Sequence, residues 1–124
     1  MNVVLWIVAS LLALAFLGAG LMKLTQPKAQ LATKGLAWTE DYSVGAVKAI
    51  GALELLAGIG LILPALLDVA PIFVPLAALG LAVIMVGAIV VHARRKETNA
   101  LPINLVFLVL AVVVVWGRFG PYAF

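Results

Sequence analysis

Four long apolar runs constrain the fold of this chain more than any other feature of its sequence. They cover about residues 3–22, 44–66, 71–92 and 101–118. Because a helix needs about 20 residues to cross the roughly 30 Å of hydrocarbon in a bilayer, each run is long enough to span a membrane. The chain is 66% hydrophobic and 10% charged, whereas soluble proteins are about half apolar and a quarter charged. The sequence therefore predicts an integral membrane protein.

The four runs are expected to be helices that pack as one bundle. A bilayer offers no water to the backbone, so even the valine-rich fourth run must satisfy its hydrogen bonds within the segment as a helix. Each run has one face of small or polar residues, which lets neighbouring helices approach closely. A chain of 124 residues leaves no room for a separate soluble catalytic module. The predicted fold is an all-α integral membrane four-helix bundle in a single transmembrane domain, residues 1–124.

The first run is expected to be a retained span and not a cleaved secretion signal. It lacks a basic n-region, and only "AFLGAG" offers small residues for cleavage. The run is also long enough to cross the bilayer, which supports its retention.

The connection between the first and second runs predicts a short interfacial helix. Thr25 can cap it, Pro27 fits its first turn and Gly35 can end it. Trp38 and Tyr42 would then lie at the level of the lipid headgroups. An irregular loop of solvated charges is the alternative interpretation.

Basic residues are concentrated in the first and third connections, which lie on the same side of a protein with four spans. The positive-inside rule places these connections in the cytoplasm and both termini outside the cell membrane. Basic residues at span ends also suit lipid headgroups better than nucleic acid, so membrane lipids are the expected partners. The basic residues concerned are Lys23, Lys28, Lys34, Arg94, Arg95 and Lys96, and the opposite side carries Asp68 and Arg118.

The residue types that are rare or missing narrow the possible chemistry. The chain has no cysteine, which excludes a thiol–disulfide mechanism and iron–sulfur or zinc–cysteine sites carried by this chain alone. His92 is the single histidine, so a metal site or a bis-histidine haem site built from this chain is not predicted.

Glu54 is the most informative residue because it lies inside an apolar run. At about 100° per residue, Gly51, Glu54 and Gly58 share one stripe of the second helix. Glycines mark a face that packs against another helix, so Glu54 is predicted to point into the bundle. We expect Gly80 and Gly87 of the third run to meet a neighbour in the same way. A carboxylate at this depth must be neutralised, paired or hydrogen-bonded.

Four more polar residues are predicted to approach Glu54 from the cytoplasmic end of the bundle. Lys23 ends the first helix, Lys48 begins the second, His92 ends the third and Asn104 begins the fourth. Together they predict a polar pocket with Glu54 at its floor. Glu54 could pair with Lys48 or Lys23, or hydrogen-bond to Asn104. It could be a structural fastener, or it could bind a cationic, protic or quinone-like ligand or carry a proton.

Two of the basic residues near span ends also have simpler interpretations. His92 precedes Arg94 and Arg95, so it can be an interfacial residue at a helix C-terminus, where the helix dipole favours a cation. Arg118 in "WGRFGP" is expected to be an interfacial anchor beside Trp116, with an anionic headgroup or a subunit as the alternative partner.

Four segments in this order resemble the DoxX-like family of small four-helix membrane proteins. They are "FLGAGLMKL", "KAIGALELLAGIGLILP", "PLAALGLAVIMVGAIVVHARRKE" and "NLVFLVLAVVVVWGRFGP", and together they cover nearly the whole chain. The family takes its name from a subunit associated with thiosulfate:quinone oxidoreductase, and other relatives are linked to membrane redox complexes or to assembly of membrane proteins. The resemblance implies that the recurring polar positions are Lys23, Lys48, Glu54, His92 and Asn104.

The resemblance and the buried carboxylate favour an accessory or quinone- or lipid-binding component of a membrane redox complex, not an enzyme on its own. Without cysteine, such a role requires a bound cofactor, for which quinone is the candidate, or a partner chain. The expected partners are an oxidoreductase or a second copy in a homodimer. The alternatives are a small proton-coupled transporter and a non-catalytic assembly or scaffold protein. In proton-coupled multidrug exporters of this size the acid lies in the first helix, which here has none.

Overall fold

The computed structural model describes residues 2–27, 30–31, 42–97 and 101–124. Within the described residues, four helices are long and apolar enough to cross a membrane. Their bounds agree with the predicted spans to within a few residues. The prediction of an all-α integral membrane bundle is therefore confirmed, and the chain is a multi-pass membrane protein. The helices are α1 (Asn2–Thr25), α3 (Val44–Leu67), α4 (Phe73–Arg94) and α5 (Leu101–Phe119).

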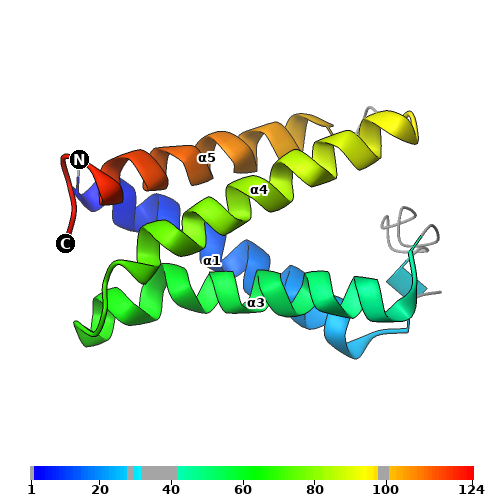
Figure 1. The fold of residues 1–124 in the computed structure, drawn as a ribbon, viewed down its shortest axis with the longest axis horizontal. Helices are drawn as coiled ribbons and strands as arrows, with labels where there is room; N and C mark the ends of the chain where they lie inside the picture. Colours follow the sequence, from blue (N-terminus) through cyan, green and yellow to red (C-terminus); the bar gives the residue numbers. More distant parts are fainter. Residues whose placement is uncertain (1, 28–29, 32–41, 98–100) are drawn as a thin grey trace.

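The helices are arranged as a ring in which each packs mainly against two others. α1 packs against α3 and α5, and α4 also packs against α3 and α5. Both termini lie at the same end of the molecule as the turn between α3 and α4 (Figure 1). From that end, α4 diverges from α3 toward the opposite end (Figure 1).

The packed core lies inside this ring and draws on all four helices. Phe16 of α1 and Phe107 of α5 meet edge to face, with ring centroids 5.3 Å apart. Edge-to-face aromatic pairs contribute beyond their buried area, so this contact helps to hold α1 against α5. The buried residues of the core cluster are Leu12, Ala13, Phe16, Leu61, Val74, Ala78, Leu81, Ala82, Met85, Ala111 and Val114.

Glycines bring the backbones of α1 and α3 into direct contact. A Cβ atom built on Gly20 would lie 2.5 Å from the carbonyl oxygen of Gly51, and one on Gly58 would lie 2.9 Å from Leu17 Cγ. Real Cβ atoms do not approach other atoms so closely, so only glycine fits at these positions. The predicted packing face of α3 is confirmed by this contact.

The corresponding prediction for α4 is wrong. Gly80 and Gly87 are both exposed, and no atom of the described residues lies within 4 Å of a Cβ built on either. The buried face of α4 instead carries larger side chains such as Leu81 and Met85. A heptad spacing of glycines therefore did not identify the packed face here, because the rotation of α4 about its axis turns the face of Leu81 and Met85 inward.

The short interfacial helix predicted after Thr25 is not supported. Positions 28–29 and 32–41, which include Gly35 and Trp38, lie outside the described residues. The backbone N–H groups of Gln30 and Leu31 donate to the carbonyl oxygen of Pro27 at 3.0 and 3.1 Å. These two bonds describe one turn, which does not establish a helix along the membrane surface.

Candidate functional site

An ion pair between Lys23 and Glu54 joins α1 to α3 inside the membrane-spanning bundle. Lys23 Nζ lies 2.5 Å from Glu54 Oε1, and the two residues are only 6% and 3% exposed. The glycine contact sets this geometry, because a Cβ on Gly51 would lie 2.7 Å from Lys23 Cβ. The last turn of α1 therefore lies directly against α3, and the lysine side chain needs only to reach one turn along it. Among the partners considered for Glu54, the structure selects Lys23.

Lys48 lies apart from this pair, although it is on the same helix as Glu54. Its Nζ donates a hydrogen bond to the carbonyl oxygen of Leu24 at 2.9 Å, and the side chain is exposed. Lys48 precedes Glu54 by six residues, a rotation of about 120° around the helix. Six residues also place Lys48 about 9 Å nearer the end of the helix, where its side chain reaches the end of α1 and a lysine ammonium can stay hydrated.

A cavity of about 420 Å³ lies next to the ion pair and is bounded by all four helices. Most of its wall is apolar or aromatic, and its polar groups come from five residues. Tyr42 is the one that the sequence places at the headgroup level instead. The other four are predicted pocket residues, namely Lys23, Glu54, His92 and Asn104. The position of Tyr42 one residue before the Ser43 cap of α3 is the signal that could have indicated the pocket. The lining residues are Phe16, Ala19, Lys23, Tyr42, Ile50, Glu54, Ile84, Met85, Gly87, Ala88, Val91, His92, Asn104 and Phe107.

Two buried nitrogen atoms at this cavity have no hydrogen-bond partner among the described residues. They are Nδ1 of His92 and Nδ2 of Asn104, on residues that are each 8% exposed. His92 belongs to the last turn of α4 and Asn104 to the first turn of α5, so the two residues approach the cavity from adjacent helix ends. Buried polar atoms in native proteins are nearly always satisfied by protein groups or ordered water, so these two nitrogens make the cavity a candidate binding site.

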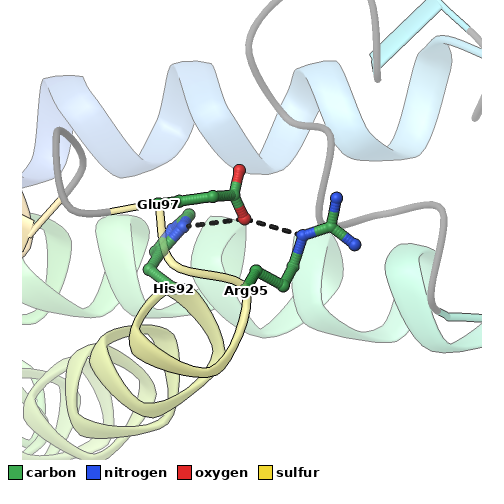
Figure 2. Close-up of polar contacts among 3 residues, drawn as sticks. All are labelled: His92, Arg95 and Glu97. Atoms are coloured by element: carbon green, nitrogen blue, oxygen red, sulfur yellow. Dashed lines mark hydrogen bonds and ion pairs between the residues drawn. The ribbon is translucent and has the colours of Figure 1, made fainter.

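The turn that follows α4 explains why His92 Nδ1 has no hydrogen-bond partner among the described residues. Glu97 N–H donates to His92 O at 2.8 Å, and Lys96 adopts a φ of 59°, a pattern typical of helix C-termini. The turn brings Glu97 Oε1 to 3.6 Å from His92 Nδ1, which is too long for a hydrogen bond. Arg95 Nε donates to the same oxygen at 2.7 Å (Figure 2). The carboxylate of Glu97 thus forms a hydrogen bond with Arg95 and lies within ion-pair distance of His92.

Arg118 lies at the opposite end of the bundle and is turned inward. Its Nη1 donates to Asn2 Oδ1 at 2.6 Å and to the carbonyl oxygen of Tyr122 at 2.8 Å. The guanidinium carbon lies 3.9 Å from the ring centroid of Phe124, and the residue is 4% exposed. Arg118 therefore ties α5 to the start of α1 and to the C-terminal residues. Trp116, which is 51% exposed, is the residue that faces outward here.

Comparison with known proteins identifies a family over most of the chain. A model described as the DoxX-like family matches residues 7–114. No curated protein and no solved structure gives a significant match. The matched range includes the ion pair and both unpartnered nitrogens of the cavity, and it ends before Arg118.

Proposed function

This chain belongs to the DoxX-like family, and we propose that its cavity binds the head group of a membrane-soluble quinone or a similar lipophilic hydrogen-bond acceptor. On this proposal the protein is an accessory component of a membrane redox complex and not an enzyme on its own. The absence of cysteine means that any redox step would occur on the bound quinone or on a partner oxidoreductase.

One observation carries this proposal, namely the two nitrogens at the cavity wall that have no hydrogen-bond partner among the described residues. An amide N–H₂ such as Asn104 Nδ2 is a donor, and a histidine Nδ1 that carries hydrogen is also a donor. A quinone presents carbonyl oxygens, which accept hydrogen bonds. A cavity of about 420 Å³ also falls within the usual range for small-molecule pockets, which are mostly apolar with a few polar groups.

The charges at the site favour a neutral head group over an ionic one. The charges of Lys23 and Glu54 lie 2.5 Å apart, so they largely cancel for a ligand placed beside them. A ligand with its own net charge would enter a mostly apolar cavity without an added counter-ion, which is costly in a membrane. A quinone head is polar and neutral, and it avoids this cost.

The proposed location of the site follows from the distribution of charge. Under the positive-inside rule, the end of the bundle that carries Arg94, Arg95 and Lys96 faces the cytoplasm. His92 lies in the last turn of α4 and Asn104 in the first turn of α5, at this same end. The quinone head would therefore bind in the cytoplasmic half of the cell membrane, with both termini outside.

Asn104→Leu tests this proposal because it removes the donor and keeps a side chain of similar volume. We expect decylubiquinone to bind the purified protein in mild detergent, and the variant to bind it about 10-fold more weakly, which corresponds to about one hydrogen bond. Stability should be unchanged or higher, because an unsatisfied buried group is removed. Isothermal titration calorimetry measures the affinity, and native mass spectrometry reports bound quinone and co-purifying subunits.

Ser10→Ala is the control, since Ser10 is exposed on α1 and does not line this cavity. It should bind decylubiquinone as the wild type does. If the wild type binds no quinone, or if Asn104→Leu binds it equally well, the proposal is wrong. A co-purifying membrane protein without bound quinone would favour the assembly role, for which the ion pair between α1 and α3 would serve only as a fastener.

A further inference from the structure

Among the described residues, the cavity reaches the surface at Gly87 of α4, which is exposed, and Ile50 of α3 lines the same cavity. Near their connecting turn these helices touch, since a Cβ built on Gly60 would lie 3.0 Å from Ala77 Cβ. The helices are antiparallel, so ten residues from Gly60 back to Ile50 correspond to ten residues from Ala77 to Gly87, or roughly 15 Å along each helix. At that level Gly87 is exposed, and a Cβ built on it meets no described atom within 4 Å. The exposure of Gly87 at this level indicates an opening between the two helices among the described residues, and Figure 1 shows that α4 diverges from α3 away from their turn.

The edges of this opening are apolar on both sides. Ile50 on α3 and Ile84, Gly87 and Val91 on α4 all line the cavity. The isoleucines and the valine are half-buried. In contrast, the polar lining groups, His92 and Asn104 among them, belong to helix ends. The cavity thus has an apolar side and a polar end.

We propose that the opening between α3 and α4 is a lateral portal, through which the apolar tail of a single amphiphile extends from the bilayer into the cavity. This inference rests on the proposed function for the position of the head group and adds the path and the class of ligand. The head would bind beside His92 and Asn104. The tail would pass between Ile50 and Gly87 and lie among the acyl chains of the surrounding lipid.

A lipid-like tail fits this opening better than a helix of a partner protein does. A helix is about 10 Å wide, so it could cover the opening from outside but could not enter and reach the two unpartnered nitrogens. An alkyl or isoprenoid chain is narrow enough to lie beside Gly87, where no side chain of the described residues comes within 4 Å of a built Cβ. Its methylene groups also match the apolar edges of the opening.

Photolabelling from the lipid phase tests the portal without assuming the identity of the head group. The protein is reconstituted in vesicles of phosphatidylcholine that carries a diazirine in one acyl chain, and the labelled residues are found by mass spectrometry. Phe16 and Met85 line the cavity but are 3% and 5% exposed, so an acyl chain reaches them only by entering. We expect both to be labelled in the wild type.

Gly87→Trp should close the portal and reduce the labelling of Phe16 and Met85 by at least about fivefold. Gly80→Trp is the matched control, because Gly80 is also an exposed glycine of α4 with no described atom near its built Cβ, but it does not line the cavity. The control should be labelled as the wild type is. Both variants are expected to fold because neither new side chain meets the packed core, and thermal unfolding in detergent verifies this.

Two quinones separate this inference from the proposed function. One is decylubiquinone, which has a ten-carbon tail, and the other is the same head group without a tail. Decylubiquinone should compete with the photolabel. Gly87→Trp should weaken the binding of decylubiquinone more than that of the tailless quinone. Labelling of Phe16 and Met85 with no binding of either quinone would support the portal and reject the quinone. Unlabelled Phe16 and Met85 in the wild type, or equal labelling in Gly87→Trp, would overturn the portal even if both quinones bind. A dimer that Gly87→Trp dissociates, without lipid labelling, would also overturn it.

Discussion

Two charged residues, Lys23 and Glu54, form the polar centre of a bundle that is otherwise apolar. Each would be costly in hydrocarbon alone. Together they form an ion pair at 2.5 Å that connects the end of α1 to the middle of α3. The pair therefore fixes the position of these helices relative to each other and provides the polar side of the cavity.

Removing one member of this pair should destabilise the protein more than removing both. Lys23→Met leaves the Glu54 carboxylate buried without its cation, which we expect to lower the free energy of unfolding by about 3–5 kcal/mol. Lys23→Met combined with Glu54→Met should recover most of this loss, since an apolar pair of similar size needs no charge compensation. Titration with sodium dodecyl sulfate in mixed micelles measures the free energy of unfolding of the wild type, the single variant and the double variant.

Lys48→Met is the matched control for this cycle, because the Lys48 side chain is exposed. We expect it to change the free energy of unfolding by less than about 1 kcal/mol. A small effect of Lys23→Met, or a double variant no more stable than that single variant, would show that the ion pair contributes little.

Arg118 should depend on the shape of its guanidinium as well as on its charge. In Arg118→Lys, an ammonium group can keep one of the hydrogen bonds to Asn2 and Tyr122 but loses the planar stacking on Phe124. We expect a loss of about 1–2 kcal/mol in the free energy of unfolding. Arg94→Lys, at an exposed position, should change it by less than about 0.5 kcal/mol. The same detergent titration decides this, and equal stabilities would contradict a specific role for the guanidinium.

At the scale of helices, the close contact of α1 and α3 is what makes the ion pair possible. Gly20 and Gly51 face each other across the contact, and their backbones leave no space for a methyl group. Because the obstructing atoms belong to backbone, they cannot move aside as a flexible side chain could. A larger residue here would push the helices apart and displace Lys23 from Glu54.

Gly20→Ala is therefore expected to be strongly destabilising. Its Cβ would lie 2.5 Å from Gly51 O and 2.7 Å from Leu55 N, and such overpacking costs about 1–3 kcal/mol or more. Gly18→Ala is the control on the same helix, since a Cβ there meets no described atom within 4 Å. It should be neutral or stabilising by up to about 1 kcal/mol, because alanine favours the helix. Thermal unfolding in detergent compares the two, and equal effects would contradict the close backbone contact.

At the scale of the whole molecule, the two ends of the bundle differ in packing and charge. α3 and α4 touch near their turn and separate toward the other end, where the cavity lies (Figure 1). The basic residues at the end of α4 belong to the end where the two helices separate. Arg118 lies at the other end, near the turn between α3 and α4, and is buried against the ring of Phe124. The polar end of the cavity and the positive charge of the protein thus lie on the same side of the membrane.

The orientation in the membrane is predicted by this asymmetry of charge. The chain has no cysteine, so single-cysteine variants can be labelled with a membrane-impermeant maleimide on intact cells. Val69→Cys, in the turn between α3 and α4, and Ala123→Cys should react from outside. Ala93→Cys should react only after the cells are opened, because its end of α4 is expected to be cytoplasmic. The reverse pattern would invert the orientation and place the cavity in the outer half of the membrane.

The sequence by itself determined the membrane class, the four spans and the inward direction of Glu54. These depend on hydrophobic length and helical periodicity, which act within each segment. It also placed Lys23, His92 and Asn104 at one end of the bundle, since each lies at the end of a span.

Only the tertiary structure decided which of these groups meet. Whether Glu54 pairs with Lys23 or Lys48 depends on the rotation and separation of α1 relative to α3, which the glycine contact sets between segments far apart in the chain. The exposure of Gly87, the open side of the cavity and the inward turn of Arg118 depend in the same way on the tilt and packing of helices. A local pattern carries no information on tilt, because the tilt results from contacts among all four helices together.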